Sequence, residues 1–149
     1  MARRVFFSFH YERDVWRASV VRNSWVTKPD RESAGFFDAG IWEEARKKGD
    51  AAIKKLIDGA LVGTTVTAVL IGAETSTRTY VKYEIDQSIA RGNGLLGIRI
   101  HNIKDTAGKT DSWGANPLPL GYAVYDWVND TGYANLGAWV DAAAKKAGK

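Results

Sequence analysis

The sequence lacks cysteine entirely, and its 149 residues include only two histidines, three prolines and one methionine. Without cysteine there are no disulfides, thiolate zinc sites or cysteine nucleophiles, and this is typical of a protein from a reducing cytoplasm. His10 and His101 are too few for a His-rich metal site, and neither has a partner at helical ligand spacing. We therefore predict a cytoplasmic protein without a metal site.

Long hydrophobic runs are also missing. The longest apolar run, AVLIGA, is far shorter than the ~20 residues that span a bilayer, and the run VFFSF near the start is too short for a secretory signal. The net charge is +4, but the basic residues are mixed with acidic ones and form no stripe interleaved with aromatic residues. We expect neither a membrane nor a nucleic acid as partner.

The apolar residues that are present predict an α/β fold. Nearly continuous apolar segments indicate strands covered on both faces, at residues 5–9, 35–37, 66–72 and 95–101, with a fifth short strand within 122–128. Helical spacing predicts helices at about residues 12–25, from Asp50, from Thr75 or Ser76, and around 136–144. This alternation favours a flavodoxin-like, doubly wound, five-stranded parallel sheet of order 2-1-3-4-5.

The length fits one domain, residues 1–149, and residues 102–120 are predicted to form a long loop. Ligands of open parallel sheets bind beyond the carboxyl ends of the strands. Polar and aromatic residues gather at these predicted ends: His10, Tyr11, Asp38, Trp42, Gly72, Glu74, Thr75, His101 and Asn102. They indicate a binding site, although loops are polar in any protein.

Several known site types are absent from the sequence. The third predicted strand ends in Leu70-Ile71-Gly72, so the acidic acceptor of a phospho-receiver domain is missing there. Neither a GxxxxGK[ST] phosphate loop nor a GxGxxG turn after a strand occurs, and no GxSxG nucleophile motif is found.

The stretch TRTYVKYEIDQSIARGNG carries a carboxylate next to a buried helix stripe. At 100° per residue, Glu84 falls about 60° to one side of Val81, at the border of the stripe that contains Ile85. Tyr80 stands one turn earlier on the same face. Spacing alone indicates a boundary glutamate on an amphipathic helix.

Four long segments carry a family resemblance: RRVFFSFHYERDVWRASVVRNSWVTK, AGFFDAGIWEEARKKGD, TTVTAVLIGAETSTRTYVKYEIDQSIARGNGLLGIRIH and YAVYDWVNDTGYANLGAWV. Together they resemble the TIR-like family of the bacterial Thoeris anti-phage defence system over nearly the whole chain. The resemblance implies a TIR fold and an enzyme that cleaves the nicotinamide–ribose bond of NAD. It also implies that the product is a cyclic ADP-ribose isomer, a second messenger that activates a separate effector.

The same resemblance assigns roles to individual residues. It makes Glu84 the catalytic residue and Tyr80 the aromatic residue four positions earlier, where the family usually has tryptophan. The substrate-binding residues that it implies are Phe7, Ser8, His10, Asp38 and Asn116. NAD is then the substrate, with no cofactor. The family further implies activity that depends on self-association, with residues 28–35 meeting a neighbour's site, and a phage-derived trigger.

A single carboxylate suits this chemistry. Nicotinamide leaves as a neutral molecule, so no general acid is needed, and a fixed carboxylate stabilises the positive charge that develops on the ribose. Glutamate is ionised at neutral pH unless burial raises its pKa. Cyclisation also requires the dinucleotide to fold back away from water, and Phe7, Tyr80 and Trp113 are candidates to stack on it.

Two alternatives remain open from the sequence. One is a non-catalytic TIR-like or flavodoxin-like module that binds a nucleotide or a protein, in which Glu84 is structural. The other is a nucleoside ribosyltransferase-like enzyme that acts on nucleosides rather than NAD.

Overall fold

The computed structural model describes residues 3–37 and 39–149, and it contains a five-stranded sheet in which every strand is parallel to its neighbours. The strands are β1 (Arg3–Ser8), β2 (Arg31–Ala34), β3 (Val66–Ile71), β4 (Gly94–Arg99) and β5 (Val124–Asp126). Their order is β2-β1-β3-β4-β5, which confirms the predicted flavodoxin-like topology. The long loop between β4 and β5 was also predicted, and it contains only turns and irregular structure.

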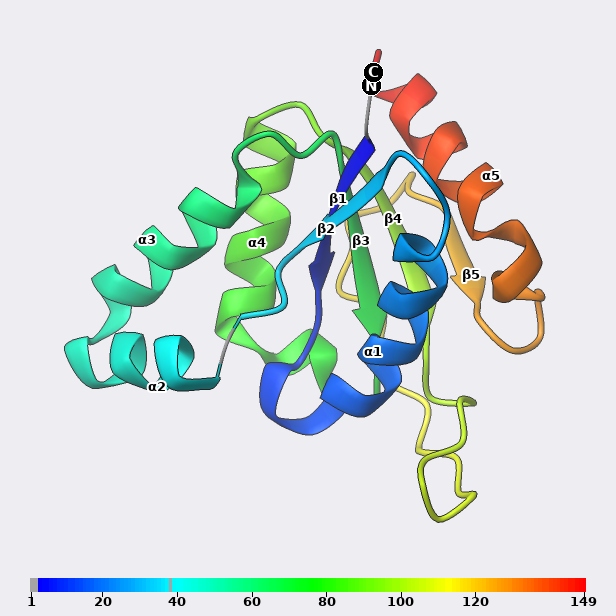
Figure 1. Cartoon of the computed structure of the whole chain (residues 1–149), viewed down its shortest axis with the longest axis horizontal. Helices are drawn as coiled ribbons and strands as arrows, with labels where there is room; N and C mark the ends of the chain where they lie inside the picture. Colours follow the sequence, from blue (N-terminus) through cyan, green and yellow to red (C-terminus); the bar gives the residue numbers. More distant parts are fainter. Residues whose placement is uncertain (1–2, 38) are drawn as a thin grey trace.

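Helices cover both faces of this sheet (Figure 1). One face carries α1 (Tyr11–Val26) and α5 (Gly132–Lys146). The other carries α2 (Ala39–Lys48), α3 (Asp50–Leu61) and α4 (Thr79–Ala90), with a short 3₁₀ turn, η1 (Thr75–Thr77), just before α4. Among the described residues, none of these helices is long and apolar enough to cross a membrane.

Strand alternation in β1 decides which side chains face which helices. Val5 and Phe7 belong to the core cluster under α1 and α5, whereas Phe6 packs into the cluster formed with α2 and α3. Ser8 lies two positions after Phe6 on the same strand, so its side chain points to the same side of the sheet, on which α4 lies. The end of β1 therefore presents a hydroxyl, rather than an apolar side chain, to α4.

Two predictions about the elements were wrong. The second strand is Arg31–Ala34, not residues 35–37, because Gly35 has a φ of +94° and leaves the extended conformation. A Cβ at Gly35 would overlap the carbonyl oxygen of Phe7, so only glycine allows this close backbone approach. Helix α4 begins at Thr79 and not after Thr75 or Ser76, because those residues form η1. The Thr75 hydroxyl instead accepts a hydrogen bond from the Gly72 N–H, 2.7 Å away.

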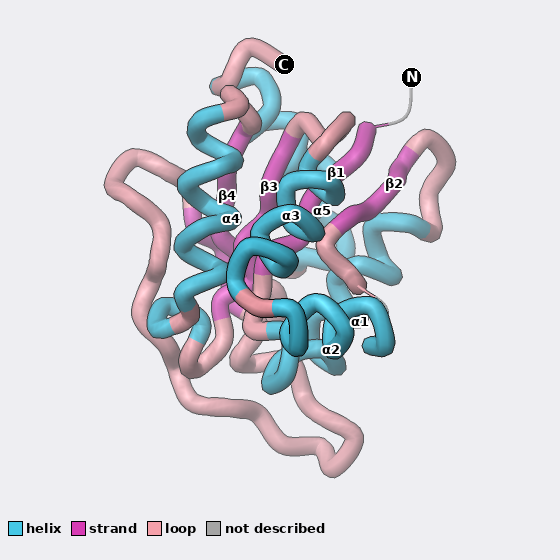
Figure 2. Tube along the Cα trace, turned by 90° about the vertical axis from the view of Figure 1, so that its left-hand side faces the viewer, coloured by secondary structure: helices cyan, strands magenta, loops and turns pink. Residues whose placement is uncertain are grey.

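The carboxyl ends of the strands lie at one edge of the sheet, the lower edge in Figure 1. Figure 2 shows the β4–β5 loop reaching well beyond that edge. The loop is held to α1 by Arg13, whose guanidinium binds Asp111 at 2.8 Å, and by Arg17, which donates to the carbonyl of Ile103 at 2.7 Å. The starts of α1, α2 and α4 border the same carboxyl edge.

Candidate functional site

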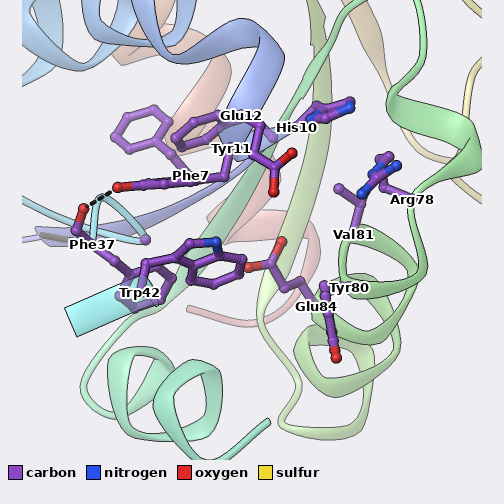
Figure 3. A pocket seen from close by; sticks show the side chains of 12 residues that line it. Phe7, His10, Tyr11, Glu12, Phe37, Trp42, Arg78, Tyr80, Val81 and Glu84 are labelled. Carbon is purple, nitrogen blue, oxygen red and sulfur yellow. Dashed lines mark hydrogen bonds between the residues drawn. The ribbon is translucent and has the colours of Figure 1, made fainter. Parts of the chain in front are cut away.

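A pocket lies at this carboxyl edge, between the end of β1 and the start of α4 (Figure 3). Its walls are formed by Phe7, Phe9, His10, Tyr11, Glu12, Gly35, Phe37, Trp42, Arg78, Tyr80, Val81 and Glu84. The volume of the pocket is about 40 Å³, which holds no more than a few water molecules. Sites for small ligands commonly measure ~300–1,000 Å³, so a dinucleotide requires this pocket to widen or extends beyond it.

Glu84 provides the carboxyl group of this pocket. Its side chain is only 6% exposed, and the Ser8 hydroxyl donates a hydrogen bond to its Oε1 at 2.7 Å. Burial raises the pKa of Glu84 to about 8, although the hydrogen bond from Ser8 acts in the opposite direction. The carboxyl group is therefore mostly protonated at neutral pH when the pocket is empty, contrary to the reference behaviour of glutamate.

The burial of Glu84 corrects the interpretation of this residue as a boundary glutamate. On one flank, Val81 and Ile85 pack with apolar residues of β3 and β4. On the other flank, Tyr80 and Tyr83 pack against the cluster built from α2 and α3. Glu84 lies between two flanks of α4 that are both covered, so its side chain is also removed from water.

Aromatic side chains close the pocket on the side of α2. Trp42 is 8% exposed, and its ring centroid lies 5.0 Å from that of Tyr11 and 5.6 Å from that of Phe37. Tyr80 meets the edge of Trp42 at 6.4 Å, and its hydroxyl donates to Asp50 Oδ1 at 2.9 Å. An aromatic wall therefore stands next to the carboxyl group, as expected of a site that stacks flat rings.

The structure also brings the other predicted residues at the end of β1 to the pocket. His10 is the N-cap of α1, where its Nδ1 accepts a hydrogen bond from the Arg13 N–H at 3.4 Å. Burial and the nearby Arg78 guanidinium lower the pKa of His10, so its imidazole is neutral at pH 7. Phe7 borders the pocket, but its ring packs in the core under α1 and α5, 5.9 Å from Phe36.

Two of the predicted residues, Asn116 and Trp113, do not line this pocket. Asn116 lies in the β4–β5 loop and is not among the pocket residues; its Oδ1 accepts a hydrogen bond from the Leu118 N–H at 3.0 Å. Trp113, a stacking candidate, is 63% exposed, and the Arg99 guanidinium lies 4.4 Å from its ring. Asp38 lies outside the described residues.

Arg78 and Glu12 line the pocket but received no role from the sequence. Arg78 immediately precedes the first residue of α4. Because the helix was predicted to start near Thr75 or Ser76, this position of Arg78 was missed. Glu12 lies in the first turn of α1, next to two residues that were placed at the rim, His10 and Tyr11. A correct start for α4 would have found Arg78, whereas Glu12 already stood at the start of the predicted helix over residues 12–25 and was not assigned to the site.

The arrangement can bind a flat cationic ring and stabilise positive charge. Its one buried carboxyl group is oriented by a hydroxyl, its neutral imidazole accepts through Nδ1 from the Arg13 N–H and so can donate through Nε2, and its walls are aromatic. No group of three or more His, Cys, Asp or Glu side chains that could hold a metal ion occurs among residues 3–37 and 39–149.

Comparison with known proteins gives two matches. Residues 6–105 match the family described as "Thoeris protein ThsB, TIR-like domain". A protein of Bacillus cereus (strain MSX-D12), named "Putative cyclic ADP-D-ribose synthase ThsB1", is 48% identical over 140 residues, which cover 93% of this chain and 72% of that protein. Every residue that lines the pocket falls within the family match.

Proposed function

This chain belongs to the ThsB TIR-like family of Thoeris proteins, and we propose that it consumes NAD and releases a cyclic ADP-ribose isomer. The relative's name specifies a cyclic ADP-D-ribose synthase. The observation that carries the proposal to this chain is the buried Ser8–Glu84 pair in an aromatic pocket at the carboxyl edge of the sheet. NAD is the substrate in this proposal, and no cofactor is required.

In the proposed reaction, the bond between the ribose C1′ and the nicotinamide nitrogen breaks, and its electron pair stays on the nitrogen. Nicotinamide leaves neutral, and C1′ carries the positive charge of an oxocarbenium-like transition state. The ionised Glu84 carboxylate, held by Ser8, faces this charge in a site of low water content and stabilises it. The pyridinium that enters the pocket also favours the ionised form of Glu84, and so lowers its raised pKa.

Cyclisation requires an acceptor within the same molecule. A nucleophilic atom of the adenosine half attacks C1′ and loses a proton to solvent, so the product is lighter than ADP-ribose by one water. The small volume of the pocket supports this outcome, because it leaves little room for attacking water beside the ribose. Tyr80, which lines the pocket and is only partly buried, can stack on a flat ring while the molecule folds back.

Three further parts of the proposal concern partners. The chain self-associates through TIR contacts, with residues 28–35 meeting a neighbour's site. The cyclic product acts on a separate effector, and a phage-derived trigger starts turnover. A cytoplasmic location and a single domain over residues 1–149 remain predictions of the same kind.

The test is mass-resolved chromatography of NAD incubated with the wild type and with Glu84→Gln. Asp86→Asn is the matched control, because Asp86 is an exposed carboxylate two positions further along the same helix. We expect nicotinamide and a product one water lighter than ADP-ribose from the wild type and the control, and neither from Glu84→Gln.

Other outcomes separate the alternatives. Linear ADP-ribose as the product would keep Glu84 catalytic and make the enzyme a hydrolase. Cleavage of nucleosides but not of NAD would favour a nucleoside ribosyltransferase-like activity. NAD binding without turnover, even with extract of phage-infected cells added, would favour a non-catalytic binding module and contradict the proposal.

A further inference from the structure

A groove continues the Glu84 pocket outward over the starts of α3 and α4. It has a volume of about 290 Å³ and is lined by Glu12, Trp42, Arg46, Gly49, Asp50, Ile53, Arg78 and Tyr80. Four of these residues, Glu12, Trp42, Arg78 and Tyr80, also line the pocket at Glu84. The pocket and the groove therefore share a wall, so a molecule with one end at Glu84 can extend along the groove.

Arg78 supplies a cation to this groove without a partner of its own. Its side chain is exposed and makes no ion pair with any residue in the described part of the chain. The other guanidinium in the groove, that of Arg46, lies 3.1 Å from carboxylate oxygens of both Glu12 and Glu43. Arg78 is thus the guanidinium of the groove that is available to an anion.

The carboxylates of the groove are occupied. Glu12 is paired with Arg46 at 3.1 Å. Asp50 accepts a hydrogen bond from the Tyr80 hydroxyl at 2.9 Å and forms an ion pair with Lys54 at 3.1 Å. These interactions reduce the repulsion that a bound anion would meet from the two acidic side chains.

The start of α4 reinforces the positive potential at Arg78. Arg78 is the N-cap of this helix, and no side chain forms a capping hydrogen bond there. The first backbone N–H groups of a helix have no intrahelical acceptor, and the helix dipole makes this end favourable for negative charge. An anion that pairs with Arg78 can therefore also approach these N–H groups.

Trp42 contributes a hydrogen-bond donor to the site that is independent of Arg78. Its indole nitrogen is buried and has no hydrogen-bond partner among the described residues, while the side chain is only 8% exposed. Figure 3 shows this nitrogen on the edge of the ring that faces Glu12 and Glu84. A buried N–H without an acceptor is unfavourable, and an oxygen of a bound molecule would satisfy it.

We propose that the groove is the subsite for the diphosphate and adenosine half of the dinucleotide, with the diphosphate on Arg78 and the Trp42 indole N–H donating to the ligand where groove and pocket meet. This inference rests on the proposed function, which places the ribosyl–nicotinamide bond at Glu84. It reduces the mismatch in size, because the pocket then has to widen only for the reacting end of NAD. Arg78 and Trp42 are binding residues in this assignment, and Tyr80 forms the shared wall.

The test is calorimetric titration of ADP, which carries the diphosphate and adenosine but lacks the nicotinamide riboside. The variants are Arg78→Gln and Trp42→Phe, and Lys82→Gln is the matched control, because Lys82 is an exposed cation one turn further along α4 that does not line the groove. We expect Arg78→Gln to weaken ADP binding about tenfold or more and Trp42→Phe about threefold or more, since hydrogen bonds with a charged partner are the stronger ones. Lys82→Gln should bind ADP as the wild type does.

The outcomes separate this subsite from the proposed function. If NAD is not turned over but ADP binding depends on Arg78, the subsite stands and the catalytic proposal fails. If the wild type turns over NAD but does not bind ADP, the subsite is wrong. It is equally wrong if Arg78→Gln, folded as shown by an unchanged melting temperature, binds ADP with wild-type affinity and keeps the wild-type KM for NAD.

Discussion

The hydrogen bond from Ser8 to Glu84 offers the sharpest test of the proposed catalytic site. Glu84 is buried and has a pKa of about 8, and the Ser8 hydroxyl is the group that favours its ionised form. Ser8→Ala removes this donor and leaves a small side chain in its place. We therefore expect the pKa of Glu84 to rise further above 8 in the variant.

The size of the shift follows from the kind of hydrogen bond. A bond to a charged group contributes about 1.5–3 kcal/mol, and 1.36 kcal/mol corresponds to one pKa unit, so the pKa should rise by about one to two units. At pH 7 a wild-type pKa of about 8 leaves roughly one tenth of Glu84 ionised, and the variant would have ten to a hundred times less. The value of kcat/KM at pH 7 should fall by the same factor.

The assay is the pH profile of kcat/KM for NAD cleavage between pH 6 and 10, because this parameter reports the pKa values of the free enzyme. The kcat/KM of the wild type should rise with pH, reach half its maximum near pH 8 and level off above that pH. Ser8→Ala should rise along a curve displaced to higher pH and approach the wild type at the alkaline end. Ser8→Thr, which keeps a hydroxyl, should restore much of the activity at pH 7.

Two results would refute this reasoning. A wild-type profile that is flat from pH 6 to 9 would mean that Glu84 is not the ionising group in the reaction. A uniform loss of activity in Ser8→Ala at every pH, with an unchanged midpoint, would mean that Ser8 positions the substrate or the fold and does not stabilise the carboxylate.

Two further predictions concern stability. The folded-state pKa of Glu84 is about 8 and its ordinary value is 4.5. Its contribution to stability is therefore present below pH 4.5 and is lost as the pH rises through 8. We expect Glu84→Gln to unfold at a higher urea concentration than the wild type at pH 9 and to show little difference at pH 5. Asp14 is 1% exposed, neither of its carboxyl oxygens has a hydrogen-bond partner in the described part of the chain, and burial raises its pKa to about 6 from 3.8. Its stabilising contribution is lost as the pH rises from about 4 through 6, so Asp14→Asn should raise the free energy of unfolding by about 1–3 kcal/mol at pH 8 and change it little at pH 4. Urea unfolding at the two pH values checks the second prediction, and an equal effect at both would contradict it.

The sheet was predictable because four of its strands are marked by apolar side chains. The second strand was misplaced because it is an edge strand with the sequence RESA, in which Glu32 is exposed and only Ala34 is buried. The apolar pair Phe36 and Phe37 follows this strand and suggested the wrong segment. Helix α2 was missed for a related reason, since it buries only Trp42 and Ala45.

The residues of the site could be predicted only in part. Family resemblance identified Glu84, Tyr80, Ser8 and His10, and all four line the pocket or bind a residue that does. The environment of Glu84 was not visible from one helix, because its burial depends on α3 covering the second flank of α4. A helical wheel describes only one element, whereas a pKa depends on every element packed around the group.

The burial of Glu84 connects the stability of the empty protein with its proposed reaction. An ionised carboxylate in this pocket would lack a cation to balance it, so the empty site holds the neutral acid at pH 7. The pyridinium of NAD brings the missing positive charge, and its entry makes the ionised carboxylate favourable where it was unfavourable before. The stabilising charge on Glu84 then forms when the substrate is bound, and binding near pH 7 should release a proton to the buffer. In the proposed reaction, the same burial that weakens the fold at alkaline pH thus couples the ionisation of Glu84 near pH 7 to substrate binding.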